Sequence, residues 1–264
     1  MLVRPSQPLV IPSAPQPTDA WHLVERSQRL KPSSGWIIPQ PAHSALSGEI
    51  AAKLSPDHFP GLSDDILRTI ALHDTGWSAF DAQQIENLRS VRGFRPISFI
   101  AEAPDVYLNA WTISIDAAER ISAAAGEMVS RHFTSVRSNA ESASNAREQQ
   151  QEDAFHAQER ARQQRLAPLT GRTDEQREQL LQALRFSDLV SLFLCSNIDL
   201  QIGAAAHFSQ NVTHSEGYVL RREPDAWAFA AENTPLREAA EMTFSGLSFG
   251  DSAKGGSWFT VRLR

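Results

Sequence analysis

The sequence predicts a mainly α-helical protein, a helical bundle with a small antiparallel β element. Apolar positions recur at helical spacing through most of the chain; His43, Leu46, Ile50 and Leu54, for example, fall at i, i+3, i+7 and i+11 of one helix face. Segments with strand character are short and lie toward the two ends of the chain. The last two flank a glycine-rich turn at 250–256, which favours an antiparallel hairpin.

Several segments have the spacing or composition of helices. The clearest begins at Ser63, a good N-cap, carries Asp64 and Asp65 in its first turn, and ends near Gly76. The tract 138–165 alternates acidic and basic residues, which favours a solvated helix over a flexible segment. The other predicted helices are 41–54, 116–133 and 174–197, and the predicted strands are 2–4, 21–25, 35–38, 218–221, 241–244 and 258–262.

The pattern divides the chain into three parts. Five prolines among residues 1–20 favour extended chain, and this segment is interpreted as a proline-rich arm. Residues 21–210 are expected to form the helical domain. Residues 211–264, where the helical signal fades after Phe208, are expected to form a β-rich extension packed on that same domain.

Composition excludes several classes of protein. The chain has 264 residues, with 25 Lys+Arg against 31 Asp+Glu and a formal net charge of −6, which argues against a nucleic-acid partner. Its single cysteine, Cys195, excludes an internal disulfide and a multi-thiolate zinc site. There is no apolar run of the ~20 residues that span a bilayer, and no apolar core of a signal peptide near the first residue. We therefore expect a cytoplasmic protein without a membrane partner.

Three polar residues occupy predicted apolar helix faces. They are His43, His132 and Asp188. A buried carboxylate requires a partner or a cation. For Asp188 that partner could be Arg185, one turn earlier, in an ordinary ion pair. Each histidine taken alone is more simply a hydrogen-bonded core residue.

The dipeptide His73-Asp74 adds two ligand-type side chains at a helix end. His73 could instead simply favour the negative end of the helix dipole, with Asp74 starting the turn. Taken with His43, His132 and Asp188, the pair lets several helices offer imidazole or carboxylate groups to one centre. Such ligands suit iron, manganese, zinc or nickel better than calcium or magnesium. The hypothesis is therefore a divalent transition-metal site.

The ordered set His43, His73-Asp74 and Asp188 resembles the ligand set of the HD superfamily of helical metal-dependent phosphohydrolases. A closer resemblance is to the uncharacterised domain-of-unknown-function family 3891, over roughly residues 35–197. The matching pieces are Trp36, Gln40-Pro41-Ala42-His43, Leu46-Ser47-Gly48, His73-Asp74-Thr75-Gly76-Trp77, Asp81, Gly93, Pro96, Phe99, Ser130-Arg131-His132-Phe133, Asp188 and Ser191-Leu192.

The resemblance implies an HD-like helical bundle that hydrolyses a phosphoester or nucleotide-like small molecule through metal-bound hydroxide. The metal ligands would be His43, His73, Asp74 and Asp188. Asp74 would also orient the attacking water, and His132 would be a further ligand or face the substrate. Arg131 would contact phosphate, and the metal would be Mn, Fe, Ni or Zn.

One departure from the HD pattern concerns the substrate. Many HD phosphohydrolases place a lysine soon after His-Asp-x-Gly, and here Trp77 stands there. A cation stabilises charge on a phosphoryl group, so Arg92, Arg95 or Arg131 would have to replace that lysine. Two other functions stay open, an iron-dependent oxygenase and a non-catalytic ligand-sensing or interaction module. A homo-oligomer is compatible with each of them.

Overall fold

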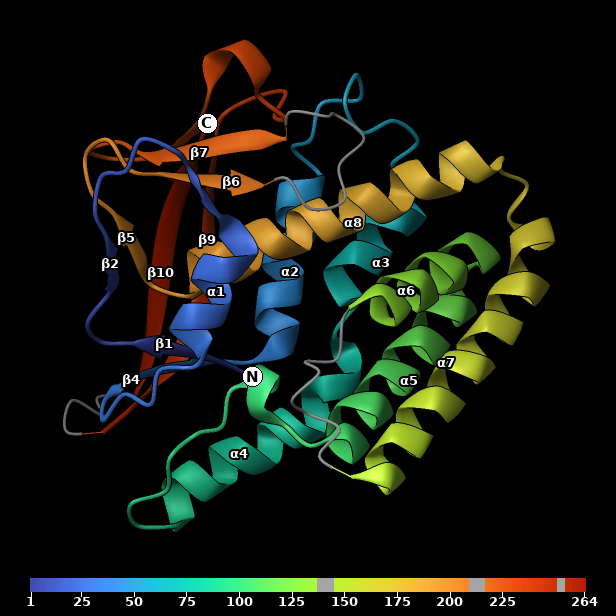
Figure 1. The fold of residues 1–264 in the computed structure, drawn as a ribbon, viewed down its shortest axis with the longest axis horizontal. Helices are drawn as coiled ribbons and strands as arrows, with labels where there is room; N and C mark the ends of the chain where they lie inside the picture. Colours follow the sequence, from blue (N-terminus) through green and yellow to red (C-terminus); the bar gives the residue numbers. More distant parts are fainter. Residues whose placement is uncertain (137–144, 209–216, 251–254) are drawn as a thin grey trace.

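The computed structural model describes residues 1–136, 145–208, 217–250 and 255–264. It shows an α/β protein, 53% helical, built around a large mixed sheet (Figure 1). The prediction of a mainly α, HD-like bundle with a small antiparallel β element is therefore wrong. The reason is that strands from both ends of the chain join one sheet, and local spacing carries no signal for such distant pairing.

The main sheet has eight strands in the order β1-β4-β9-β10-β8-β7-β6-β3. Neighbours run antiparallel except β10 with β8 and β6 with β3, which are parallel. A second sheet pairs β2 with β5 in parallel. The strands are β1 Leu2–Pro5, β2 Leu9–Ile11, β3 Thr18–Asp19, β4 Gly35–Ile38, β5 Ile198–Leu200, β6 Ala205–Phe208, β7 Tyr218–Arg222, β8 Trp227–Phe229, β9 Ala240–Phe249 and β10 Gly256–Leu263.

The N-terminal segment is part of both sheets. Residues 1–20, interpreted as an arm, contain β1, β2 and β3. Met1, Leu2 and Val3 are buried, so the apolar residues between the prolines are core residues. The predicted strand 21–25 is wrong, because residues 20–28 form a helix that begins where Asp19 accepts a hydrogen bond from the His22 amide.

The C-terminal strands confirm the prediction for that region. Strands β9 and β10 form an antiparallel ladder from Leu247 opposite Gly256 to Ala240 opposite Leu263. The turn predicted between them includes residues 251–254, which lie outside the described residues. Strand β4 pairs with β9, which joins the N-terminal strands to this hairpin.

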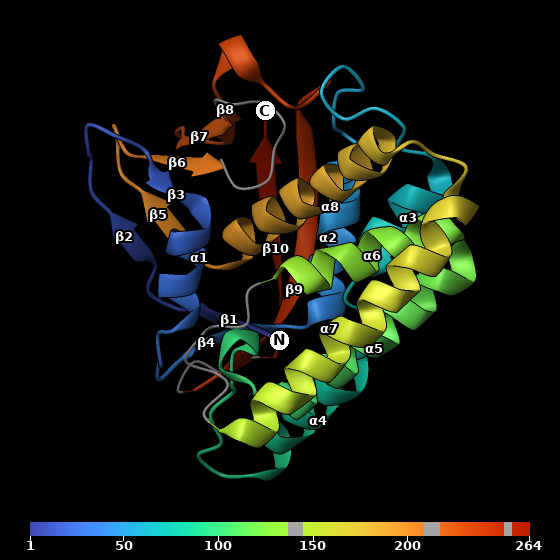
Figure 2. The ribbon, with the colours of Figure 1, turned by 45° about the vertical axis from the view of Figure 1, so that its right-hand side comes forward.

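The helices lie in layers over the sheet. Helix α8 runs between the strands on one side and α5, α6 and α7 on the other (Figures 1 and 2). None of the described helices is both long and apolar enough to cross a membrane. The α-helices are α1 Ala20–Gln28, α2 Gln40–Ala51, α3 Asp64–Leu72, α4 Ser78–Ser90, α5 Pro104–Ile121, α6 Ala123–Ser135, α7 Ala146–Leu166 and α8 Asp174–Cys195.

Two predicted helices differ from the observed ones. The segment 116–133 was predicted as one helix but is divided between α5 and α6 at Ser122, which has an extended backbone and accepts a hydrogen bond from the Ala125 amide. Of the polar tract 138–165, residues 146–165 lie in α7, and residues 137–144 lie outside the described residues.

Close approaches at two glycines bring the site helices together. A Cβ on Gly48 would lie 2.4 Å from the Ala71 Cβ, so α2 and α3 touch at this point. A Cβ on Gly76 would lie 2.0 Å from the Ala110 carbonyl oxygen, so the turn after α3 sits directly on α5. Larger residues at either position would push apart the elements that carry His43 and His73.

Candidate metal centre

The five predicted ligands converge in the interior, between α2, α3, α6 and α8. His43 comes from α2, His73 and Asp74 follow the last turn of α3, His132 comes from α6, and Asp188 comes from α8. The two carboxylates contact all three imidazoles. The side chains of His43 and His73 are each 1% exposed, and that of Asp188 is 14% exposed. The sequence therefore identified side chains that the fold brings together.

Two carboxylate oxygens lie at the centre of the cluster. Asp74 Oδ2 lies 3.0 Å from His43 Nε2 and 3.6 Å from His73 Nε2. Asp188 Oδ1 lies 3.4 Å from His43 Nε2 and 3.3 Å from His73 Nε2. The other oxygen of Asp188, Oδ2, lies 3.6 Å from His132 Nε2. Both histidines of the pair thus point their Nε2 atoms at the same two carboxylates.

The hydrogen bonds of Ser191 determine the tautomer of neutral His43. The Ser191 hydroxyl donates its one hydrogen to the Asp188 carbonyl oxygen at 2.8 Å. The same hydroxyl oxygen lies 2.6 Å from His43 Nδ1, so it accepts from that nitrogen. With its hydrogen on Nδ1, neutral His43 presents a lone pair at Nε2.

His73 is held in the same tautomer by a backbone carbonyl. Its Nδ1 lies 2.8 Å from the Ile70 carbonyl oxygen, which can only accept a hydrogen bond. The Ser44 hydroxyl, 3.0 Å from the same Nδ1, donates to the Ile70 carbonyl and so also accepts. A neutral His73 therefore also turns its Nε2 lone pair toward the Asp74 and Asp188 carboxylates.

His132 completes the cluster, but among the described residues it makes fewer polar contacts than His43 and His73 do. Its ring is edge-on to His73, with 5.5 Å between centroids and 86° between planes. Its Nδ1 is buried and has no hydrogen-bond partner within the described residues. Such an atom costs free energy unless another group uses it.

The pKa values of His73, Asp188 and His132 depend on one another. Burial alone would lower the pKa of His73, but the Asp74 and Asp188 carboxylates outweigh it and raise that pKa to about 9. Burial alone would raise the pKa of Asp188, but His73, with His43 and His132, lowers it to about 2. Burial, with the positive charges of His73 and Arg185, lowers the pKa of His132 to about 4.

The donor set fits a divalent transition-metal ion. When both imidazoles are neutral, two Nε2 lone pairs face two carboxylates, and this arrangement is unfavourable unless a positive charge lies between them. A proton on His73 supplies that charge in the metal-free protein, and a metal ion can take its place. One ligand atom from each of His43, His73 and Asp188 lies within 4.8 Å of the others. Imidazole nitrogen and carboxylate oxygen suit iron, manganese, nickel and zinc. Asp74 and His132 offer further ligand atoms beside these three.

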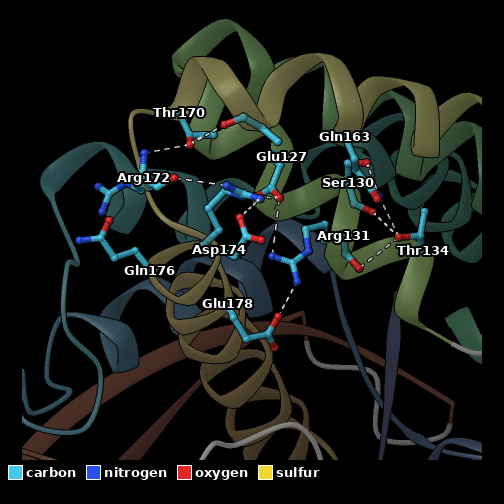
Figure 3. A network of polar contacts seen from close by, with 12 residues as sticks. Glu127, Ser130, Arg131, Thr134, Gln163, Thr170, Arg172, Asp174, Gln176 and Glu178 are labelled. Carbon is cyan, nitrogen blue, oxygen red and sulfur yellow. Dashed lines mark hydrogen bonds and ion pairs between the residues drawn. The ribbon is translucent and has the colours of Figure 1, made fainter.

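Arg131, predicted to contact phosphate, has other partners. Its guanidinium forms a hydrogen bond and ion pair with Glu178, and Nη1 lies 3.6 Å from a carboxylate oxygen of Glu127 (Figure 3). The network in Figure 3 ties α6 to the first turns of α8. Arg131 therefore serves an interhelical contact in this structure.

Trp77, which stands where many HD phosphohydrolases have a lysine, is a core residue. It is 1% exposed and packs edge-on against Phe80, with 5.8 Å between ring centroids. The expected pair between Asp188 and Arg185 does not occur within the described residues; Asp188 contacts histidines instead. Arg92 and Arg95 are exposed.

Sequence reasoning assigned no role to the serines that support the site, although Ser47 and Ser191 are among the residues that match the family. Ser44 and Ser191 fix the two imidazoles, and Ser47 lies 3.0 Å from the Ser191 hydroxyl. The signal was present: Ser44 adjoins one ligand, and Ser191 follows Asp188 by one helical turn. Serine is common in helices, so that spacing alone does not separate such residues from ordinary ones.

Fold and site together define an α/β protein with a buried histidine–carboxylate centre between its helices. A family model described as a protein of unknown function, DUF3891, matches residues 28–242. The chain belongs to this family, which confirms the closer of the two resemblances. Comparison with the curated proteins and with the solved structures gives no match.

Proposed function

We propose that this protein is a metal-dependent hydrolase that acts on a phosphoester or nucleotide-like small molecule. His43, His73 and Asp188 would hold the ion, with Asp74 as a further ligand. One observation carries the proposal: both Nδ1 atoms of the histidine pair are hydrogen-bonded to acceptors, so both Nε2 atoms face carboxylate oxygens. Backbone or hydroxyl groups that fix the outer nitrogen in this way are typical of metal-binding histidines.

The order of the ligands along the chain supports a hydrolytic reaction. Histidine, then His-Asp, then a later Asp is the order found in HD phosphohydrolases, although the eight-stranded sheet is unlike the bundle expected from them. A bound transition metal would lower the pKa of a coordinated water and draw charge from a phosphoryl oxygen. This analogy concerns the ligand set alone.

The chain's own residues have separable roles in this proposal. Asp74 and Asp188 bind the ion and orient the imidazoles through contacts at 3.0–3.6 Å. Ser191 and Ser44 keep a hydrogen on each Nδ1. His132 is neutral at pH 7, because its pKa is lowered to about 4, and its unpartnered Nδ1 is free to bind a substrate atom.

The first test is elemental analysis of protein purified without chelators. We compare the parent with the double variant His73→Ala/Asp74→Ala and with His22→Ala, which removes an exposed histidine on α1. Near-stoichiometric metal in the parent and in His22→Ala, and its loss from the double variant, is the expected result. A parent without metal, even after incubation with manganese, iron, nickel or zinc, would refute the proposal. Phosphoesters and nucleotides are then screened with the metal that binds.

An iron-dependent oxygenase is the second candidate, and a specific observation favours it. Two histidines and one carboxylate, His43, His73 and Asp188, form the closest group of ligand atoms. This ligand set is also that of non-haem iron oxygenases with open coordination positions. Stoichiometric iron, near-ultraviolet absorption and oxygen-dependent turnover would support this candidate. Phosphate release without oxygen would exclude it.

A further inference from the structure

Arg185 lies on α8, one turn before Asp188, and its guanidinium is poorly neutralised. Among the described residues, the nearest carboxylate oxygen comes from Glu178 and lies 3.8 Å from Nη1. Glu178 is already the partner of Arg131, and its other neighbour is Gln182. The Nε of Arg185 is buried without a hydrogen-bond partner within the described residues. Arg185 therefore keeps at least one hydrogen-bond donor, its Nε, without an acceptor.

Arg185 precedes Asp188 by three residues on α8, and Asp188 Oδ2 lies 3.6 Å from His132 Nε2. The Nδ1 of His132 is buried without a partner within the described residues. Besides burial, the positive charge of Arg185 is among the causes that lower the pKa of His132. The Arg185 side chain is 15% exposed and that of Asp188 is 14% exposed, whereas those of His43 and His73 are each 1% exposed. Arg185 and Asp188 are therefore the two residues among these four that solvent can reach.

We propose that Arg185 binds the anionic group of the substrate, a phosphoryl group or one of the same charge and shape, beside the metal centre. An oxyanion supplies the acceptor that Nε lacks and a closer one than the Glu178 oxygen 3.8 Å from Nη1. Guanidinium matches a phosphoryl group through two parallel hydrogen bonds. His132 Nδ1 is the neighbouring group for a further oxygen. Arg185 would thus supply the positive charge that, in many HD phosphohydrolases, comes from a lysine at the position where this sequence has Trp77.

This inference rests on the proposed function, and it narrows the substrate to one with an anion at the reacting group. Arg131 is the matched comparison, because it lies in the same region and its guanidinium is already paired with Glu178 and Glu127. Exchanging it removes a positive charge from the same part of the protein without removing unpaired donors near the cluster.

The test measures binding of inorganic phosphate by equilibrium dialysis. The parent, Arg185→Gln and Arg131→Gln are each loaded with metal, freed of excess ion and analysed for metal content. We expect Arg185→Gln to weaken phosphate binding by about tenfold or more at unchanged metal content. Arg131→Gln should stay within about twofold of the parent. Arg185→Lys should recover part of the affinity, because it keeps the charge but not the fork of donors.

Three results would overturn the assignment. They are a parent that binds no phosphate at millimolar concentration, equal phosphate affinity in Arg185→Gln and the parent, and loss of metal from Arg185→Gln, which would make Arg185 a support of the centre. If the parent takes up no metal, the proposed function fails separately. The same titration of metal-free protein then decides whether Arg185 binds the anion.

Discussion

Metal binding at the centre should displace one proton from His73. In the metal-free protein the Asp74 and Asp188 carboxylates, against the effect of burial, raise the pKa of His73 to about 9. At pH 7.5 nearly every molecule therefore holds a proton on this imidazole, and its Nε2 is the atom that faces the carboxylates. A metal ion competes with that proton for the same lone pair.

The magnitude follows from the pKa values of the neighbours. Asp188, with a pKa near 2, and His132, with a pKa near 4, carry no proton at pH 7.5 and release none. The expected release from His73 is about one proton per ion up to pH 8 and about half a proton at pH 9. A coordinated water shows the opposite trend, because it loses its proton increasingly as the pH rises.

Calorimetric titration with metal in buffers of different ionisation enthalpy measures this number. The slope of the observed enthalpy against the buffer enthalpy gives the protons released, and the titration is repeated between pH 7 and 9. The variant His22→Ala, altered at an exposed site, should match the parent. A release near zero at pH 7.5, or one that only rises toward pH 9, would refute the reasoning about the His73 proton.

Four further outcomes are expected. Ser191→Ala should lower metal affinity by about 10–100-fold, because the imidazole it holds loses its acceptor. Gly76→Ala should lower stability by about 1–3 kcal/mol, because its Cβ meets the Ala110 carbonyl at 2.0 Å. Cys195 should react with thiol reagents only in denaturant, because burial raises its pKa to about 12. Arg185→Met should raise the Tm of ligand-free protein by a few degrees, because the substitution removes the buried Nε that has no hydrogen-bond acceptor.

The serine and glycine variants each have a matched control. Ser187→Ala is matched to Ser191→Ala, because the Ser187 hydroxyl bonds only to carbonyls of its own helix in the described structure. Gly256→Ala is matched to Gly76→Ala, because a Cβ there meets nothing within 4 Å. Unchanged metal affinity in Ser191→Ala, equal stability of the two glycine variants, or rapid native labelling of Cys195 would each contradict the structural argument. A lower Tm for Arg185→Met would show that Arg185 stabilises the fold.

The sequence revealed the histidine–carboxylate cluster because a polar residue on an apolar helix face is an anomaly that periodicity makes visible. His43, His132 and Asp188 stood out in this way, and the fold places them in one centre. The expected partner of Asp188 was nevertheless wrong. Sequence spacing put Arg185 one turn away, but the direction of each side chain depends on α2 and α6 packing against α8, which spacing does not encode.

The extent of the sheet was missed for a different physical reason. Strand β1 was predicted at 2–4 and β4 at 35–38, but the spacing within each segment does not show that they pair with each other and, through β9, with the C-terminal hairpin. Strand β3 has two residues, too few to show a period of two, and pairs with the distant β6. The longer β9 and β10 were identified, because eight to ten residues and a glycine-rich turn do carry a local signal.

The charges around the centre favour an anionic ligand over a neutral one. Asp74 and Asp188 contribute two negative charges, and the proton on His73 offsets only one of them in the metal-free protein. A divalent ion in place of that proton makes the cluster neutral, and the incompletely paired Arg185 then leaves a local positive charge beside it. A low-dielectric site with such an excess favours an oxyanion and disfavours a neutral ligand of the same shape. Phosphate should therefore bind more tightly to the metal-loaded protein than to the metal-free protein, and Arg185→Gln should reduce the affinity in both.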